Sequence, residues 1–387
     1  MSERVYLDHA ATTALVPAAI RAITRELDRV GNPSSLHRSG RDARRVVEES
    51  REAIAAALGA HPTEVIFTSG GTEADNLAIK GAFWSARGAD AGRTGVAVSA
   101  IEHHAVLEAA EWLAKEQGAG LTLLGVDADG RVDPAAVAGL PTPTAVVSVI
   151  WANNEVGTVQ PIPRLAEQAR GIGALAHSDA VQAAGQLPID FAASGLDLMT
   201  VTGHKLGGPV GVGALLTRRE VTLTPVQHGG GQERDVRSGT VDVPAIAGFA
   251  AAVEAAVADR VAYAERLGRL RDRLVEGLAG LPGARVNGPR EAVLPGIVNV
   301  SFDGCEADAI VLLLDAAGID CSAGAACSAG VTQPSHVLLA MGRTPAEARS
   351  SVRFSFGRGT GEADLDRLLR ALPEAVERAR AAGRLAG

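Results

Sequence analysis

The chain has 387 residues, of which 47% are hydrophobic, and a formal net charge of -8 at pH 7. This length and composition predict a globular protein with a large core and two domains. The arginines form no basic run of the kind that binds nucleic acid, and no apolar stretch approaches the roughly 20 residues of a membrane span. We therefore expect neither nucleic acid nor a membrane as a partner. The charged N-terminus lacks the apolar stretch of a signal peptide, which predicts a cytoplasmic protein.

Seven short apolar runs alternate with helical stretches over the first 217 residues. Continuous apolar runs are typical of strands that are buried on both faces of a mostly parallel sheet, and helical crossovers between them indicate an α/β domain. The predicted strands span residues 65–68, 96–99, 121–126, 145–150, 174–177, 198–202 and 213–217.

From about residue 255 the pattern changes to long, arginine-rich amphipathic helices with fewer strands, at residues 296–302 and 351–356. The last helix carries an apolar stripe that buries one face: Leu365, Leu368, Leu369, Leu372 and Val376. We predict a large α/β domain at residues 15–255. A smaller α+β domain is predicted from residues 1–14 and 256–387.

Polar residues follow the predicted strands, where ligands bind in open parallel sheets. Taken alone, each of them fits a turn, a helix cap or a structural histidine, but all fall at one edge of the sheet. In chain order they are Gly71 and Thr72 in a glycine turn, His103, Asn154, Asp179, Gln182, Thr202, His204 and Lys205. A glycine-rich loop at residues 229–240, which ends in Thr240, could also approach a phosphate closely.

Lys205 is one of only 3 lysines, against 34 arginines. A lysine amine can form a Schiff base with an aldehyde, whereas a guanidinium stays protonated and is not nucleophilic. A surface lysine after a strand is the alternative, and the position alone does not decide between the two.

The three cysteines are Cys305, Cys321 and Cys327. This odd number predicts no disulfide framework, and no spacing of cysteine or histidine residues indicates a firm metal site. Cys327 lies in a run of small residues, where we expect an exposed and mobile nucleophile. The other two are predicted to be core or spectator residues.

Together these motifs resemble the fold-type I pyridoxal-phosphate enzymes, and in particular the cysteine desulfurases of the class V aminotransferase group. The resemblance runs nearly end to end, from residues 6–13 and 31–37 to residues 351–355. It implies pyridoxal 5'-phosphate as the cofactor, a homodimer, and conversion of L-cysteine to L-alanine. The sulfur would pass to Cys327 as a persulfide.

The resemblance also implies roles for the residues at the sheet edge. Lys205 would hold the pyridoxal aldehyde as a Schiff base and move protons at the substrate carbon. Asp179 would pair with the pyridinium N–H, and Gln182 would bind the phenolic oxygen of the ring. His103 would stack on the ring face and act as an acid and base.

For the phosphate, the resemblance implies Thr72, Thr202 and His204, together with the helix N-terminus at Gly71. Thr240 would reach the phosphate of the neighbouring subunit. Asn154 and Arg353 would hold the substrate carboxylate, Arg353 through a two-pronged guanidinium contact.

A sulfur acceptor follows from the same resemblance: an iron-sulfur scaffold, an apo-protein or a tRNA-thiolation enzyme. Its identity stays open, as does any part that Cys327 takes in binding the metal of an iron-sulfur cluster. Two other functions are also open: a selenocysteine lyase or small-amino-acid aminotransferase of the same group, and a non-catalytic protein of this fold. The set of Lys205, Asp179, His103 and Gln182 argues against the last.

Overall fold

A computed structural model of the protein describes residues 4–141, 143–323 and 333–386. Its centre is a seven-stranded sheet with the strand order β2-β8-β7-β6-β5-β3-β4. Every pairing is parallel except those of β8, which is antiparallel to both of its neighbours. The strands are β2 (Val65–Thr68), β3 (Gly95–Ser99), β4 (Gly120–Leu124), β5 (Thr144–Ser148), β6 (Leu175–Asp179), β7 (Leu198–Thr202) and β8 (Gly213–Thr217).

The structure confirms the predicted fold class. β2, β7 and β8 begin and end where the sequence predicts, and the other four strands differ from the prediction by one or two residues at an end. The difference at β5 shows why a strand end is hard to predict from the sequence. Val149 and Ile150 are apolar and buried, so they extend the hydrophobic run, but the strand ends before them at Ser148.

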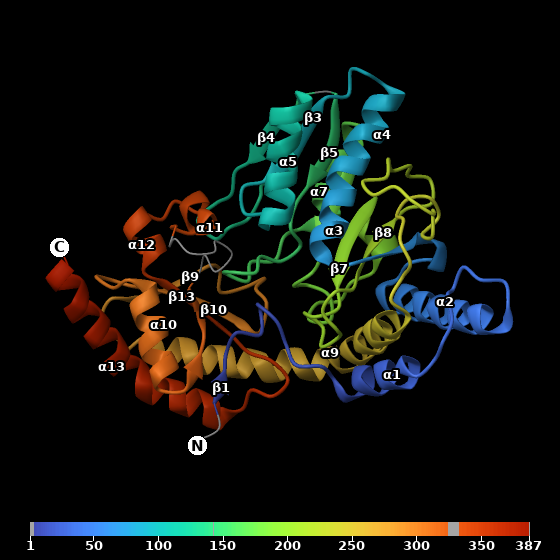
Figure 1. The fold of residues 1–387 in the computed structure, drawn as a ribbon. Coiled ribbons are helices and arrows are strands. Elements are labelled where there is room, and N and C mark those ends of the chain that lie inside the picture. Colours follow the sequence, from blue (N-terminus) through green and yellow to red (C-terminus); the bar gives the residue numbers. More distant parts are fainter. Residues whose placement is uncertain (1–3, 142, 324–332, 387) are drawn as a thin grey trace.

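Helices cover both faces of this sheet, as Figure 1 shows. On one face lie α3 (Gly71–Asn76), a π-helical segment (Leu77–Gly81), α4 (Ala82–Ala89) and α5 (His104–Gln117). The other face packs against α2 (Arg38–Leu58), α7 (Ile162–Gly171) and the first half of α9 (Val243–Leu278). Alternate strand residues serve the two faces: Ile66 packs with α3 to α5, and Val65 and Phe67 pack with the second group.

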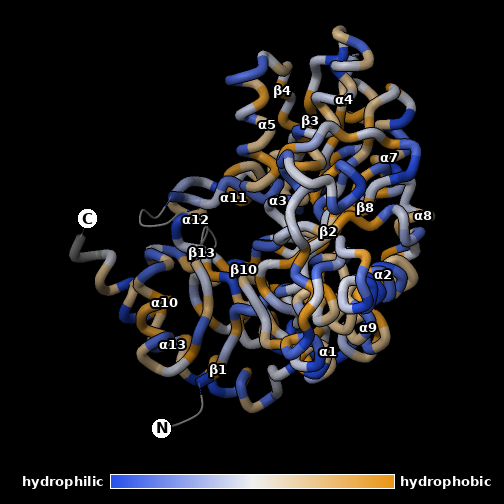
Figure 2. The backbone as a smooth tube through the Cα atoms, turned by 45° about the vertical axis from the view of Figure 1, so that its right-hand side comes forward, coloured by the Kyte–Doolittle hydropathy of each residue, from blue (hydrophilic) through white to orange (hydrophobic). Residues whose placement is uncertain are grey.

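Shorter elements complete this part of the chain. They are α1 (Pro17–Leu27), which packs on α9, α6 (Pro134–Ala138), which packs on α7, and α8 (Phe191–Ser194). Figure 2 shows hydrophilic colour on the coils of α2, which carries many exposed charged residues on the side away from the sheet.

A second, antiparallel sheet has the order β12-β13-β10-β9. Its strands are β9 (Ala284–Asn287), β10 (Ile297–Phe302), β12 (Ser322–Ala323) and β13 (Ser351–Ser355). Nearby, β1 (Val5–Tyr6) pairs in parallel with β11 (Ile319–Asp320). The helices of this part are α10 (Ala307–Ala316), α11 (His336–Ala340), α12 (Pro345–Arg349) and α13 (Glu362–Ala386), whose predicted apolar stripe is buried in the second core.

Helix α9 belongs to both cores. Residues from Ala245 to Ala256 pack with the seven-stranded sheet, and Leu267, Leu270, Leu274 and Leu278 pack in the second core. In Figure 1 this helix runs along the base of both parts. The predicted domain boundary at residues 255 and 256 lies inside α9, and the division into two domains stays a prediction. Within the described ranges, no helix is both long and apolar enough to span a membrane.

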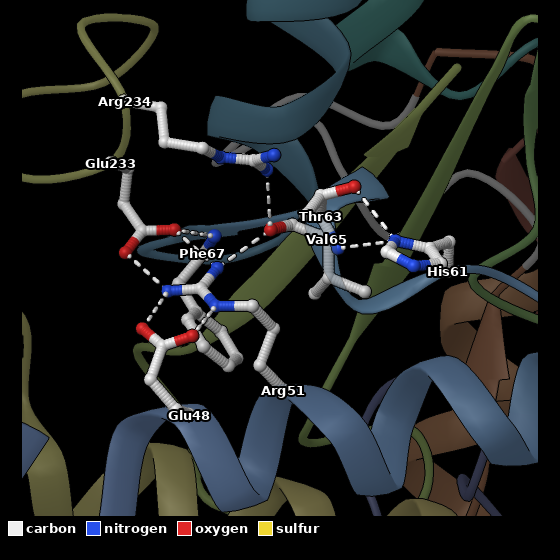
Figure 3. A network of polar contacts seen from close by, with 8 residues as sticks. All are labelled: Glu48, Arg51, His61, Thr63, Val65, Phe67, Glu233 and Arg234. Atoms are coloured by element: carbon white, nitrogen blue, oxygen red, sulfur yellow. Dashed lines mark hydrogen bonds and ion pairs between the residues drawn. The ribbon is translucent and has the colours of Figure 1, made fainter. Parts of the chain in front are cut away.

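The glycine-rich loop at residues 229–240 is attached to α2 by a buried ion pair and to β2 by hydrogen bonds to the backbone (Figure 3). Glu233 accepts hydrogen bonds from Nη1 and Nη2 of Arg51, each at 2.8 Å, and from the backbone N–H of Phe67 at 2.9 Å. The Arg51 and Glu233 side chains are only 9% and 3% exposed. Removal of one partner of such a pair leaves an uncompensated buried charge, so the loop position depends on both.

We expect the substitution Glu233→Gln to lower the free energy of unfolding by about 3 kcal/mol, because Arg51 keeps its charge and loses its buried counterion, while its other acidic partner, Glu48, is half exposed. Urea unfolding followed by circular dichroism measures this. The matched control is Glu49→Gln, which removes an exposed partner of Arg45 on the same helix and should have a much smaller effect. Similar effects of the two substitutions would contradict the structural role of Glu233.

Candidate active site

A cavity of about 290 Å³ lies at the carboxyl ends of β6 and β7. This is at the small end of the range for ligand pockets. The structure brings most of the predicted site residues together in its lining: Gly71, Thr72, His103, Asn154, Asp179, Gln182, Thr202, His204, Lys205 and Arg353. Thr240 lines two other hollows of its own chain instead, and Cys327 lies outside the described residues.

Lys205 is held against the cavity wall by backbone carbonyls from the start of the chain. It follows the end of β7, and its Nζ donates to the carbonyl oxygens of Ala10 at 2.5 Å and Ala11 at 2.6 Å. Gln182 Nε2 donates to the same Ala10 oxygen at 2.9 Å. Ala10 and Ala11 were not predicted as site residues, because a backbone carbonyl leaves no signal in residue type.

Asp179 ends β6 and is 4% exposed. Burial raises the pKa of its carboxyl group to about 6, although the Val181 N–H and the Lys205 charge oppose the shift. Asp75 on α3 also lines the cavity, and its Oδ1 is buried with no hydrogen-bond partner among the described residues. Burial, and the nearby charge of Asp179, raise the pKa of Asp75. A cationic ring nitrogen beside Asp179 would favour its ionised form.

Asp75 was missed by the sequence analysis. The sequence feature that could have indicated Asp75 is its position: it is the second acidic residue of the helix after the glycine turn, two residues beyond Glu73. Glu73 instead binds Arg237 and the Ser69 N–H.

Glu102 lies beneath the cavity, directly before His103, and its side chain is fully buried. Its Oε1 accepts hydrogen bonds from the Ser99 hydroxyl and the Ile150 N–H, both at 2.6 Å, whereas Oε2 has no partner within the described residues. Burial raises the pKa of Glu102 to about 8. The carboxyl group is therefore largely protonated at neutral pH.

The two histidines of the cavity are neutral at neutral pH. His103 is the N-cap of α5, where its Nδ1 accepts the Ala105 N–H at 3.2 Å. Burial, followed by the charge of Lys205, lowers the pKa of His103 to about 4 and has the same effect on the pKa of His204. Because His103 Nδ1 is an acceptor, the neutral ring carries its proton on Nε2.

Arg353, on β13, reaches the cavity from the second sheet. Its Nη1 donates to the Asn154 carbonyl oxygen at 3.0 Å and its Nη2 to Asp8 Oδ1 at 2.7 Å. The side chain is 5% exposed, and Nε is buried with no hydrogen-bond partner in the part of the chain that the structure describes. Of the two adjacent amides, only Asn154 lines the cavity, because Asn153 binds the Ile101 carbonyl and the N–H groups of Glu155 and Val156.

The opposite side of the cavity is suited to an oxyanion. Gly70 has φ +150°, a conformation that side chains rarely allow, and this turns the chain from β2 into α3. Gly71 and Thr72 then open the helix. The Thr202 hydroxyl at the end of β7 donates to the Val212 carbonyl at 3.2 Å, and His204 Nδ1 contacts the Thr12 hydroxyl at 3.3 Å.

This set of residues fits pyridoxal 5'-phosphate. It combines an amine for the aldehyde, a buried carboxyl group for the ring nitrogen, and hydroxyl and N–H donors for the phosphate. Two buried polar atoms in the lining residues, Asp75 Oδ1 and Arg353 Nε, lack hydrogen-bond partners within the described ranges, although His177 Nε2 lies 3.7 Å from Asp75 Oδ1, and such unsatisfied atoms are consistent with a ligand site.

Two cysteines fall within the described residues, and neither has the properties of a reactive thiol. Cys305 is buried, with its sulfur near the carbonyl oxygens of Asp303 and Val376. Burial, together with Asp8 and Asp320, raises the pKa of Cys321 to about 12. Both match the predicted core or spectator role.

Comparisons with known proteins agree with this geometry. The profile of the family described as aminotransferase class-V matches residues 5–368. An IscS-like cysteine desulfurase from Mycobacterium tuberculosis is 54% identical over 382 residues, which cover 97% of each chain. A solved structure of a NifS-like protein superimposes with a TM-score of 0.90 at 34% identity and covers 97% of this chain and 100% of its own. The structure of SspA in complex with cysteine matches with a TM-score of 0.79 at 32% identity, over 91% and 98% of the two chains.

We expect Glu102→Gln to remove a pH dependence of stability. The folded-state pKa of Glu102, about 8, lies above the value of about 4.3 for an unfolded glutamate. Its stabilising contribution is therefore complete below about pH 4.3 and is lost as the pH rises to about 8. Glutamine stays neutral, so the variant should gain stability over the wild type across this range, on the order of 1 kcal/mol per pH unit.

Urea unfolding at several pH values measures this difference. Glu108→Gln, in which the replaced side chain is 74% exposed, is the matched control and should follow the wild-type curve. Parallel curves for the wild type and Glu102→Gln would contradict the raised pKa of Glu102.

Proposed function

The chain belongs to the aminotransferase class-V family, and we propose that it is a cysteine desulfurase, which converts L-cysteine to L-alanine and takes up the sulfur as a persulfide on Cys327. The main structural support is the cavity that joins the Lys205 amine, the buried Asp179 carboxyl group and the Arg353 guanidinium. Relatives named cysteine desulfurase that match nearly the whole chain support the same reaction.

Enzymes of this family depend on pyridoxal 5'-phosphate, and the bound cofactor supplies an aldehyde that condenses with amines and a ring that accepts electrons from the substrate carbon. In our proposal Lys205 holds the aldehyde, Asp179 pairs with the ring nitrogen and Gln182 binds the phenolic oxygen. His103 covers the ring face. Burial of these groups excludes water and strengthens each polar contact.

The phosphate would be held by Thr72, Thr202 and His204 with the N–H groups at Gly71. We also propose a homodimer in which Thr240 serves the phosphate of the other subunit. Two observations support this proposal. Thr240 does not line the cavity of its own chain, and the Arg51–Glu233 pair fixes the loop that carries Thr240, so this residue is held in place for a site other than its own cavity.

For the substrate, Arg353 and Asn154 would bind the carboxylate, because Nη1 and Nη2 of Arg353 each keep a second N–H beside the one bound by the protein. Lys205 would remove and return a proton at the substrate carbon. His103 would act as the base and acid at the substrate: the neutral ring must first accept a proton and can then donate it.

In the sulfur step that we propose, the Cys327 thiolate attacks the substrate sulfur. The carbon–sulfur bond breaks, its electron pair stays with the carbon fragment, and that fragment takes up a proton and leaves as alanine. Cys327 is close enough in sequence for this. Ser322 on β12 pairs with Arg353, and the next residue is Ala323. Cys327 follows Ala323 by four residues, so the Cα atoms of Ala323 and Cys327 can be at most about 14 Å apart.

The chain after this segment also returns to the cavity. His336 Nε2 lies 2.9 Å from the Glu102 carbonyl oxygen, directly before His103, and the Ser335 hydroxyl donates to Glu155 Oε2 at 2.5 Å. A thiol between two segments that are held next to residues of the cavity lining could meet the substrate and then an acceptor. We propose a cytoplasmic location, and an iron-sulfur scaffold, an apo-protein or a tRNA-thiolation enzyme as that acceptor.

We expect Cys327→Ala to bind the cofactor normally but to form no alanine from L-cysteine, because the sulfur then has no acceptor thiol. Alanine is quantified by chromatography, and mass spectrometry of wild-type peptides should show a gain of one sulfur on Cys327. The matched control, Cys321→Ala, should keep its activity. Full turnover by Cys327→Ala would instead favour a selenocysteine lyase or an aminotransferase.

We expect the protein to be a dimer by light scattering, and Thr240→Ala to weaken binding of pyridoxal 5'-phosphate by about tenfold or more, as loss of a hydrogen bond to a charged group does. Thr240→Ser keeps the hydroxyl group and should retain most of the affinity. A monomer in solution, or equal cofactor affinity of the wild type and Thr240→Ala, would contradict the shared site.

A further inference from the structure

Asp8 binds Arg353 from outside the cavity. Asp8 Oδ1 accepts a hydrogen bond from Arg353 Nη2 at 2.7 Å, but only Arg353 lines the cavity. The Asn154 carbonyl oxygen occupies Nη1 at 3.0 Å, and Nε remains buried without a partner within the described residues. Two protein groups thus hold one N–H of each Nη, and each Nη carries a second N–H that a ligand can use.

The backbone on both sides of Asp8 is fixed. Asp8 forms an isolated parallel bridge with Ser355, and the Leu7 N–H donates to the Asp320 carbonyl at 2.8 Å. The Ser355 N–H donates to the Leu7 carbonyl at 2.7 Å, and the Tyr6 hydroxyl donates to the Asp8 carbonyl at 3.1 Å. Asp8 therefore presents its carboxylate from a rigid position between β11 and β13.

We propose that Asp8 is a positioning residue for binding of the substrate carboxylate. It fixes the plane of the Arg353 guanidinium so that the remaining N–H donors point toward the cavity. Two-pronged binding of a carboxylate requires this plane to be set. A free arginine side chain has several rotatable bonds, and fixing them before the ligand arrives lowers the cost of binding. The proposal rests on the function proposed above, because it takes the ligand of Arg353 to be a substrate carboxylate.

Two opposite effects of Asp8 on affinity can be separated. Its charge repels a second carboxylate at Arg353, and its hydrogen bond orients Arg353 to receive one. The orienting effect requires an acceptor atom at position 8 but not a charge. If orientation dominates, Asp8→Ala weakens carboxylate binding and Asp8→Asn, which keeps an acceptor oxygen, restores most of it. If repulsion dominates, both substitutions strengthen binding.

The experiment compares L-alanine with L-alaninamide, which has the same amine but a neutral carboxamide. Dissociation constants are measured from the absorbance of the holoenzyme. We expect Asp8→Ala to weaken L-alanine binding by about tenfold or more, to change L-alaninamide binding by less than about twofold, and to raise KM for L-cysteine more than it changes kcat. Asp8→Asn should recover most of the L-alanine affinity. The control is Asp320→Asn, which removes a nearby carboxylate on β11 that binds Arg4 and not Arg353. This variant should bind both ligands as the wild type does.

Unchanged or tighter L-alanine binding by Asp8→Ala would overturn the proposal, and so would an equal loss for both ligands. If Asp8→Ala does not fold, Asp8→Glu tests the same point, because its carboxylate is displaced by one methylene and should also weaken L-alanine selectively. Alanine formation from L-cysteine by the wild type is measured in parallel. If the wild type forms alanine while the Asp8 variants prefer L-alanine over L-alaninamide as strongly as the wild type does, only the proposed role of Asp8 fails. If it forms none, the proposed function fails as well.

Discussion

The cavity buries two carboxyl groups and wholly or partly shields an amine and two imidazole rings from water, and the cost of this desolvation determines the protonation state of these groups. Burial keeps His103 and His204 neutral and raises the pKa of Asp179 to about 6. A ligand with a positive ring nitrogen and a phosphate would reverse part of this cost, because it brings a cation to Asp179 and an anion to the N–H groups of α3. The residues of the site are therefore arranged to receive a ligand that carries these charges.

The N-terminal segment connects the two cores at this cavity. Leu7 bonds to backbone of both β11 and β13, the Ala10 and Ala11 carbonyls bind Lys205, and the Thr13 N–H donates to the His204 carbonyl. Lys205 follows a strand of the seven-stranded sheet and Arg353 lies on the second sheet, so a shift between the cores would change the distance between Lys205 and Arg353. Helix α9, packed in both cores, opposes the same shift.

Residues with strong local signals were predictable from the sequence. Asp179, His103 and Lys205 each follow an apolar strand, and parallel strands place their carboxyl ends at one edge. The partners of Lys205 were not predictable, because Ala10 and Ala11 use backbone oxygens about 195 residues away in the sequence. Asp75 escaped detection because acidic residues on a helix are usually exposed. The predicted role of Thr240 involves a second subunit, which a single chain cannot display.

The thiol that takes the sulfur must satisfy two conditions that conflict inside this protein. It must ionise easily, because the thiolate is the nucleophile, and it must reach a cavity whose walls disfavour buried anions. Cys321 lies near Arg353 but fails the first condition, since burial and the carboxylates of Asp8 and Asp320 raise its pKa to about 12. Cys305 is packed in the second core and fails the second. A thiol that ionises in solvent and enters the site only when a substrate sulfur is present meets both conditions. In our proposal Cys327 is that thiol, and in the sequence it lies between β12, which pairs with the strand of Arg353, and Ser335 and His336, which bind residues next to the cavity lining.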